Sequence, residues 1–216
     1  MTTDPSEKPL SPWWRHAVIL VMVFGFSVLT MLTVLTYTNA PPIPERVTDA
    51  AGTTLFTRDD VEHGQEVFLK YGLMEHGTLW GHGAYLGPDY SAEYLHRLAE
   101  VTRDTLARER HGRPYAELDP DAAAGLDPAV HRLLKENRYD PASGTLRFSA
   151  AEAAAWQVQK AEWAEYFSGP TPAPGLPAQY IRDAGELEDL NSYFAWAAWA
   201  TVANRPGKDY SYTNNW

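Results

Sequence analysis

The chain contains no cysteine among its 216 residues. Disulfide bonds, thiolate nucleophiles and iron–sulfur clusters all require cysteine side chains, so the sequence excludes them. A haem attached through thioether bonds is excluded for the same reason. Any redox or metal chemistry in this chain would therefore depend on other side chains.

Positive charge is also scarce, because 18 lysines and arginines stand against 28 aspartates and glutamates, giving a formal net charge of −10. Nucleic-acid binding needs a basic surface that neutralises phosphates, and the sequence shows no basic patch. We therefore expect no nucleic-acid partner. The hydrophobic fraction of 44% and the eight tryptophans supply enough material for a folded core.

Common catalytic motifs are absent as well. The sequence contains no nucleophile elbow, no phosphate-binding loop and no HExxH zinc motif. His63, His76 and His82 could in principle meet with Glu66 around a metal, but their spacing favours ordinary structural histidines. The sequence therefore predicts no catalytic residue in this chain.

A single long apolar run without charge extends from Ala17 to Tyr37. As a helix it would span about 31 Å, the thickness of the hydrocarbon core of a bilayer. Trp13 and Trp14 precede it, where amphipathic rings prefer the membrane interface. A cleaved signal peptide is the alternative, but its apolar region would be shorter and its cleavage point, after Ala40, would meet two prolines. We predict a transmembrane helix over residues 17–38.

The charges flanking this run predict its orientation. Lys8 and Arg15 precede it, whereas Arg46 is the one basic residue that follows closely. Basic residues concentrate on the cytoplasmic side of membrane helices. We therefore expect residues 1–16 in the cytoplasm and the main domain outside it.

Capping signals predict several helices in the outer domain. A serine or threonine followed three residues later by an acid marks a helix start, and glycine marks many helix ends. The predicted helices run from Thr57 to about Gly72, from about Ser91 to Gly112, from Asp127 through Leu134, from Ser149 to about Gly169, and from about Gly185 to Asn204.

Little else in the outer domain suggests regular structure. Glu117–Asp127 is acidic and predicts a loop, and strand signal is confined to Thr145–Phe148. The expected class is all-α. The stretch Tyr193–Ala203 (YFAWAAWATVA) is apolar on almost every side yet too short to span a bilayer, so it must be buried against something.

One segment follows the spacing of a c-type cytochrome. Gly64–His76 (GQEVFLKYGLMEH) resembles the first helix and haem-attachment motif of that class. Gly72 and Glu75 stand where the two haem-binding cysteines would be, and His76 stands at the iron-ligand position. The scaffold spacing is retained without the means of covalent attachment.

Two longer stretches carry a more specific resemblance. Leu55–Arg97 and Phe194–Trp216 resemble the N-terminal region of single-chain, quinol-dependent nitric oxide reductases, members of the haem–copper oxidase superfamily. The resemblance covers essentially the whole chain from residue 17, although Ala116–Gly144 carries little of it. It implies one transmembrane helix followed by a helical, cytochrome c-like domain that lacks haem c.

The family implies an organisation for the chain and a location in the bacterial inner membrane. The implied parts are a cytoplasmic tail (1–16), a transmembrane helix (17–38), a periplasmic cytochrome c-like domain without haem (39–204), and a run-in (205–216) to a further transmembrane helix not present in this chain. The chain would then be a fragment or one chain of a split enzyme.

The family also implies a reaction and its cofactors. Two NO molecules, two electrons from membrane quinol and two protons give nitrous oxide and water, at b-type haems and a non-haem iron. The metal-binding histidines lie in later helices, so we expect no cofactor in this segment. The expected partners are the multi-helix catalytic portion of the enzyme, the lipid bilayer and, for the whole enzyme, quinol.

The loop GHGAY, residues 81–85, carries the single site that the resemblance suggests. In haem-bearing relatives the comparable residues supply oxygens to a calcium between haem propionates, so backbone oxygens of Gly83 and Tyr85 are candidate calcium ligands. Calcium needs six to eight oxygen ligands, and the remainder would come from the catalytic bundle. A tight glycine turn without metal is the equally weighted alternative.

Three functions remain open on the sequence. The first is a docking domain that covers the outer side of the catalytic bundle, with the final helix and the GHGAY loop as its contact face. The second is a free-standing, single-pass envelope binding or assembly protein. The third is a cytochrome that holds haem non-covalently through His76. Coding sequence continuing beyond Trp216 would favour the first, and an absorption spectrum would test the third.

Overall fold

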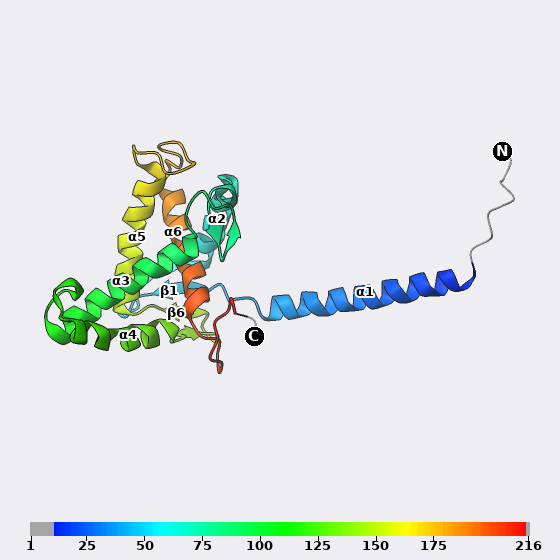
Figure 1. Cartoon of the computed structure of the whole chain (residues 1–216), viewed down its shortest axis with the longest axis horizontal. Coiled ribbons are helices and arrows are strands. Elements are labelled where there is room, and N and C mark those ends of the chain that lie inside the picture. Colours follow the sequence, from blue (N-terminus) through cyan, green and yellow to red (C-terminus); the bar gives the residue numbers. More distant parts are fainter. Residues whose placement is uncertain (1–10, 215–216) are drawn as a thin grey trace. The chain divides into compact units, whose positions relative to one another are not determined.

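The computed structural model describes residues 11–214 and separates into two units, one ending at Ala40 and one beginning at Pro41 (Figure 1). The chain is mostly helical, with 59% helix and 9% strand. This confirms the predicted class of a transmembrane helix candidate followed by a helical domain. Lys8 and most of the predicted cytoplasmic tail lie outside the described residues, as do the last two residues of the predicted run-in.

The first unit consists of helix α1, Trp13–Thr38, which has a mean hydropathy of 2.6 and no buried side chain. It is the one candidate membrane span within residues 11–214. Its serine and threonine hydroxyls are satisfied internally, since Ser27 and Thr30 donate to carbonyls four residues earlier at 2.8 Å, as do the later threonines. Such pairing is what an apolar surrounding requires of polar groups. The helix begins four residues before the predicted start.

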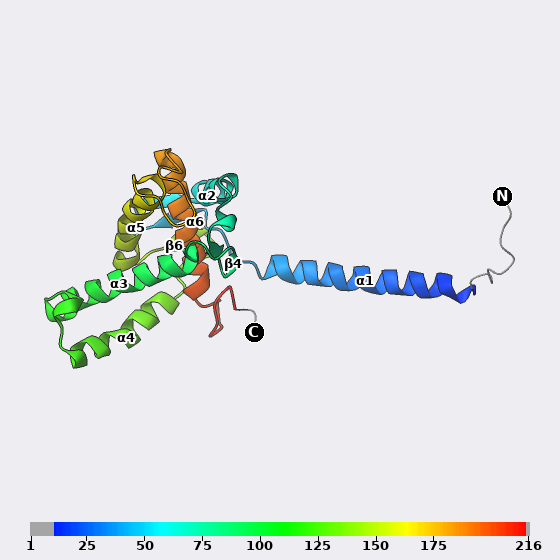
Figure 2. The same cartoon turned by 45° about the horizontal axis from the view of Figure 1, so that its top comes forward.

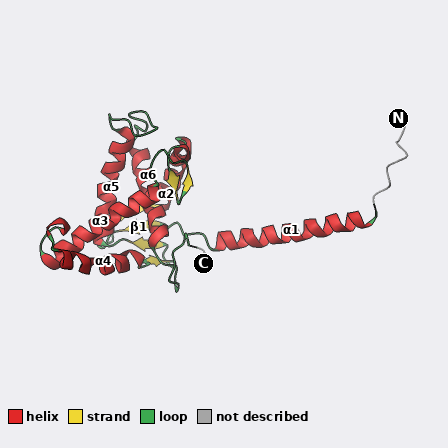
Figure 3. Cartoon of the chain, viewed as in Figure 1, coloured by secondary structure: helices red, strands yellow, loops and turns green. Residues whose placement is uncertain are grey.

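The second unit is built around five helices (Figures 2 and 3). They are α2 (Arg58–Lys70), α3 (Tyr90–His111), α4 (Pro120–Lys135), α5 (Ala150–Ser168) and α6 (Ala184–Val202), with short 3-10 turns at Leu73–Glu75 (η1) and Tyr115–Glu117 (η2). Helix α6 packs against α2, α3 and α5, and α4 packs against α3. Helix α6 is therefore the central element of the domain.

The capping signals at Thr57, Ser149 and Gly112 are confirmed. Thr57 accepts from the backbone N–H of Asp60, whose carboxylate accepts from the N–H of Thr57, so the capping box that starts α2 is complete. Ser149 and Glu152 form the same reciprocal pair at the start of α5. Gly112 ends α3 with a φ of 68°, the left-handed conformation that favours glycine.

The prediction of a loop before Asp127 is wrong. Helix α4 begins at Pro120, where the Asp119 side chain accepts from the N–H of Ala122 at 3.0 Å, and Pro128 lies inside the helix. Asp119–Pro120 carries the same cap-then-proline pattern as Asp127–Pro128. The earlier start brings Leu126 into the helix, where it joins Ala129 and Val130 in the second core.

A small sheet, which the sequence indicated only at Thr145–Phe148, forms a base for the helices. Its strands are β1 (Arg46–Thr48), β2 (Thr54–Thr57), β5 (Tyr139–Asp140) and β6 (Thr145–Arg147), in the order β2-β1-β6-β5. Strand β1 is parallel to β6, with Val47 opposite Leu146, and the other pairs are antiparallel. Strands this short show no recognisable alternation by themselves.

The apolar half of α6 is buried inside the domain. Every residue from Leu190 to Ala200 is buried, with Phe194 at 0%, Trp199 at 3% and Trp196 at 8% exposure. The expectation that this half of the helix needs an outside partner is therefore wrong. The surrounding helices supply the cover: the ring of Tyr90 in α3 stacks on Phe194 with centroids 4.8 Å apart.

The chain after α6 turns back onto it. Asn204 forms a β-bridge with Ser211, and the N–H of Tyr212 donates to the carbonyl of Ala200 at 3.2 Å. The Tyr212 ring lies 5.2 Å from that of Trp199. Residues 204–212 thus pack on the domain, while a further transmembrane helix after them stays a prediction.

Candidate functional site

The candidate calcium loop is part of a tight hairpin. Strands β3 (Thr78–Leu79) and β4 (His82–Gly83) pair antiparallel through Trp80 and Gly81, whose φ angles are 53° and 77°. Positive φ at both central positions is typical of the two-residue turn that matches strand twist. Glycine adopts this conformation freely, but a tryptophan needs compensating contacts.

Trp80 has such contacts on both its backbone and its ring. Its N–H donates to the hydroxyl of Ser91 at 3.1 Å, and its indole Nε1 donates to the carbonyl of Ala197 in α6 at 3.0 Å. The ring also lies 5.6 Å from the ring of Trp196. The hairpin is therefore fastened to the central helix of the domain.

Asp89, the N-cap of α3, fixes the other side of the hairpin. Its two carboxylate oxygens accept four hydrogen bonds, at 2.6–2.9 Å, from the hydroxyls of Thr78 and Ser91 and from the N–H groups of Gly81 and Ala92. Burial raises the pKa of Asp89, but these hydrogen bonds outweigh it and leave the pKa below its ordinary value. The carboxylate is therefore charged, and both of its oxygens are occupied by hydrogen bonds within the domain.

Gly83 cannot carry a side chain in this conformation. Its φ is 138°, and a Cβ would lie 2.2 Å from the carbonyl oxygen of Gly77. The next residue, Ala84, donates its N–H to the carbonyl of Met74 at 2.7 Å, which holds the loop against η1. Tyr85 then projects outward with 88% of its surface exposed.

The loop by itself offers little to a calcium ion. Backbone oxygens of Gly83 and Tyr85 are suitable hard donors, but two are too few for a coordination number of six to eight. The carboxylate of the same segment, Asp89, is already committed to four donors. These residues fit a calcium site only as part of a larger ligand set supplied from elsewhere.

His76, at the predicted iron-ligand position, is enclosed. It is 2% exposed, and its Nε2 is hydrogen-bonded to the hydroxyl of Tyr166 in α5 at 2.8 Å. Gly87 and Gly175 lie against its ring, and a Cβ on Gly87 would meet Nε2 at 2.3 Å. Its Nδ1 is buried without a partner among residues 11–214. Burial lowers the pKa of His76.

The residues around His76 do not fit a haem. The two thiol positions hold Gly72 and Glu75, and the nitrogen that would bind iron is engaged by Tyr166. A pocket of about 570 Å³ lies beyond Tyr166, lined by residues that include Leu86, Trp163 and Pro174, but His76 does not line it. The structure thus gives no support to the non-covalent cytochrome hypothesis.

The remaining histidines named above do not assemble into a site. Across residues 11–214 no three histidine, aspartate or glutamate side chains converge as a metal centre. His63 and His82 are exposed, and they lie on α2 and β4 respectively. The structure gives no support to a metal site at these histidines.

Sequence reasoning missed the residues that shape this region: Trp80, Asp89 and Tyr166. Asp89 carried a usable signal, because an aspartate directly before an apolar-periodic segment is a typical N-cap. Trp80 and Tyr166 carried none, since their partners Ala197 and His76 are 117 and 90 positions away.

Comparison with known proteins agrees with this geometry. No curated protein matches the chain. The family model for the NorB cytochrome c-like domain of nitric oxide reductase matches residues 44–216, which is nearly the whole second unit. The cytochrome-like spacing of α2 and η1, with His76 at the end of it, falls inside this match. The chain belongs to the family of NorB cytochrome c-like domains of nitric oxide reductase.

Proposed function

We propose that the chain is the N-terminal module of a quinol-dependent nitric oxide reductase and that its domain docks on the outer side of the catalytic helix bundle. The family match over residues 44–216 is the observation that carries this proposal. The enzyme would reduce two NO molecules to nitrous oxide with electrons from membrane quinol. The module itself performs no chemistry.

The state of the haem-binding positions supports the quinol dependence. A soluble electron donor would need a haem in the outer domain to receive electrons, whereas a quinol delivers them from within the bilayer. Gly72 and Glu75 cannot attach haem, and His76 is hydrogen-bonded to Tyr166. The domain thus keeps the cytochrome scaffold as a structural part.

The exposed side chains of the GHGAY loop, of Leu86 directly after it and of the neighbouring η1 provide the docking face. Tyr85 and Leu86 are 88% and 64% exposed, and Met74 of η1 is 41% exposed. Large apolar and aromatic side chains on a fixed loop are typical anchors of an interface. This face replaces the buried α6 as the contact region.

In the assembled enzyme the backbone oxygens of Gly83 and Tyr85 would contribute to a calcium site whose other ligands come from the catalytic portion. Elemental analysis of the purified enzyme checks this. We expect bound calcium in the enzyme, and a chelator that removes this calcium should also release the domain from the catalytic portion. Enzyme that docks the domain normally with no bound calcium would contradict it.

For the membrane, we propose that the N-terminus is cytoplasmic and the domain lies on the periplasmic side of the inner membrane. The basic residue Arg15 before the apolar core of α1 supports this orientation. Protease added to spheroplasts should digest the domain and spare the N-terminal tail. Protection of the domain in intact spheroplasts would reverse the orientation.

The test of the function is purification of the tagged chain from membranes of its native host. We expect b-type haem to co-purify and the preparation to consume NO with a quinol donor. A chain that purifies without haem and without this activity would instead be a free-standing envelope protein.

A variant pair tests the docking face within the same preparation. Replacing Tyr85 and Leu86 by alanine should lower quinol-driven NO consumption or the stability of the enzyme. Val158→Ala, at a 45% exposed apolar residue of α5, is the matched control and should change neither. Equal behaviour of both variants would place the docking face elsewhere.

A further inference from the structure

The solvent face of the small sheet carries two arginines on neighbouring strands. Arg46 of β1 lies opposite Thr145 of β6, and Arg147 is two positions further along β6, opposite Thr48. Residues two apart on a strand share a face, so all four side chains lie on the same side of the sheet. Val47 and Leu146 point the other way, into the core.

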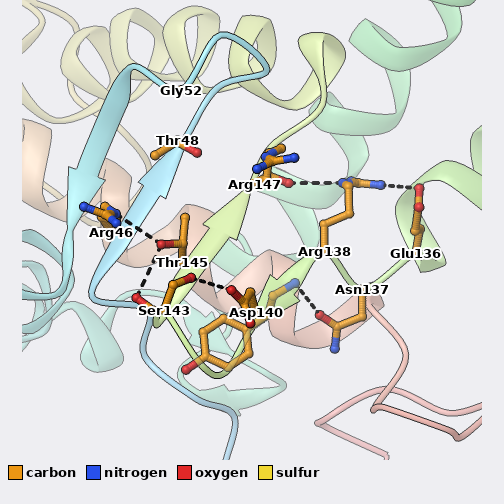
Figure 4. Close-up of a pocket in the computed structure, with 11 residues that line it drawn as sticks. Arg46, Thr48, Gly52, Glu136, Asn137, Arg138, Asp140, Ser143, Thr145 and Arg147 are labelled. Carbon is orange, nitrogen blue, oxygen red and sulfur yellow. Dashed lines mark hydrogen bonds and ion pairs between the residues drawn. The ribbon is translucent and has the colours of Figure 1, made fainter.

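These residues line a pocket of about 860 Å³ on this face (Figure 4). The pocket floor is made by β1 and β6, and its wall by the segment Glu136–Asp140. Thr48 is 6% exposed at the base, whereas Arg46 and Arg147 are exposed at its rim. The pocket is thus polar and open to solvent.

Neither arginine is neutralised by a carboxylate within residues 11–214. Arg46 donates from Nε to the hydroxyl of Thr145 at 3.1 Å, which leaves its two terminal nitrogens free, and the Arg147 guanidinium has no partner in the described part of the chain. Two free guanidinium groups in one pocket stand out in a chain whose net charge is −10.

The acidic residues nearby are already engaged. Asp140 faces Thr145 across the sheet and accepts from the Ser143 hydroxyl at 2.6 Å and the N–H of Ala142 at 3.0 Å. Other carboxylates around the pocket have their own partners: Glu136 and Glu152 pair with Arg138, Glu45 pairs with Arg58, and Asp49 accepts from the N–H groups of Ala51 and Thr53.

We propose that Arg46, Arg147, Thr48 and Thr145 form a binding site for a phosphate group, free in solution or carried by an anionic lipid headgroup. Each planar guanidinium can bind two phosphate oxygens at once, and the Thr48 hydroxyl supplies a further hydrogen-bonding group. The Thr145 hydroxyl accepts from Arg46 and donates to the carbonyl of Ser143 at 3.4 Å, so it holds the Arg46 side chain in place. Asp140 lies opposite Thr145 in the sheet, and its negative charge repels a bound phosphate. The site is independent of the docking loop and of the proposed enzyme activity.

The position of Arg46 in the sequence favours an anionic lipid as one source of the phosphate group. It follows Thr38, the last residue of the candidate transmembrane helix, by eight positions. Basic residues next to a membrane segment commonly interact with anionic headgroups. Free phosphate in solution presents the same oxygen atoms to the arginines as a lipid headgroup does. An experiment with two arms therefore distinguishes the two sources.

The first arm titrates inorganic phosphate calorimetrically into the full chain in a neutral detergent at constant ionic strength. We expect saturable binding that weakens at least about tenfold in the Arg46→Gln, Arg147→Gln double variant, because charge-assisted hydrogen bonds are lost. The matched control replaces Arg110, in the last turn of α3, and Arg113, just after that helix, by glutamine. Both arginines are exposed, and this variant should bind as the wild type does. Asp140→Asn should bind phosphate more tightly.

The second arm uses phenylglyoxal, which modifies accessible arginines, on the wild-type chain in nanodiscs without added phosphate. Mass spectrometry compares Arg46 and Arg147 with Arg110 and Arg113 in phosphatidylcholine and in phosphatidylglycerol. Protection of the first pair by phosphatidylglycerol assigns a lipid headgroup, and binding of inorganic phosphate alone assigns the free ion. The proposal is overturned if neither phosphate nor phosphatidylglycerol acts on this pair, or if the double variant binds phosphate like its control.

Discussion

Asp89 holds three separate parts of the chain together with one carboxylate. Its four hydrogen bonds reach β3, the hairpin turn and the first turn of α3. Each bond to a charged acceptor is worth more than one to a neutral group. The shape of the GHGAY loop therefore depends on a residue outside its own motif.

Replacing Asp89 by asparagine should lower the free energy of unfolding by about 2–3 kcal/mol, because an amide NH2 cannot accept from Thr78 and Gly81. Urea denaturation measures this loss. Asp119→Asn is the matched control, since asparagine caps a helix as well as aspartate does, and it should be nearly neutral. Equal effects of the two variants would show that the hydrogen bonds to the hairpin contribute nothing.

His76 should make stability depend on pH in a defined direction. Because burial lowers its pKa, the unfolded chain binds more protons at this residue than the folded one once the pH falls below about 6.5. The free energy of unfolding is therefore highest above that pH and falls below it. His76→Gln should flatten this fall in urea denaturation measured between about pH 5 and 7.5.

His131→Gln, at an exposed histidine of α4, is the control for this measurement and should keep the wild-type pH dependence. A pH profile of His76→Gln that parallels the wild type would show that His76 does not contribute.

The hydrogen bond between His76 and Tyr166 also predicts a spectroscopic result. The domain mixed with haem and desalted should show no Soret band, because one enclosed imidazole without thiols holds haem poorly. Tyr166→Phe, which frees Nε2, should be examined alongside. A stoichiometric band in the wild type that is lost in His76→Ala would restore the cytochrome hypothesis.

At the scale of elements, the contact between α2 and α6 is a close helix crossing near the site. Gly64 makes it possible, since a Cβ there would lie 2.1 Å from the carbonyl oxygen of Asp189 and 2.7 Å from the Cβ of Tyr193. Both helices would have to separate to admit a methyl group. Gly64 is the first residue of the cytochrome-like spacing, and this packing gives the glycine its physical reason.

Gly64→Ala should therefore destabilise the domain by about 1–3 kcal/mol, although alanine is the better helix former. Gly125→Ala in α4 is the matched control, because a Cβ there meets nothing within 4 Å. That variant should gain about 0.5–1 kcal/mol from helix propensity alone. Thermal unfolding measures the stability of both variants. A Gly64→Ala variant more stable than the wild type would show that α2 and α6 can separate without cost.

Helix starts were predictable to the extent that their caps are local. Thr57 and Ser149 bond to groups three residues away, so four residues of sequence contain the whole interaction. At α4 two equivalent local signals stand eight residues apart, and no local rule chooses between them. Packing of α4 against α3 made the choice, because the longer helix also brings Leu126 into the core.

For the whole molecule, the burial of α6 changes what is expected of the isolated domain. The large apolar side chains that the described domain exposes are few: Leu69, Met74, Tyr85, Leu86 and Val158. Residues 41–216 without α1 should therefore sediment as a monomer in the absence of detergent. Concentration-dependent association would show that the exposed docking face makes the isolated domain self-associate.

The sequence by itself determined the features that arise within a few neighbouring residues or from composition. These are the absence of thiol chemistry, the apolar helix α1, the capped starts of α2 and α5, and the motif that identified the family. The apolar character of α1 follows from composition, and the capped helix starts follow from hydrogen bonds within one turn, so neither needs a distant partner.

Only the tertiary structure decided which surfaces are free. It buried the aromatic half of α6, joined His76 to Tyr166 across 90 positions, and paired β1 with β6 across nearly 100. The apolar character of α6 was visible in the sequence, but whether another chain or this domain covers it depends on which helices pack around it. Burial is a property of the whole arrangement, because the area removed from water depends on every neighbour at once.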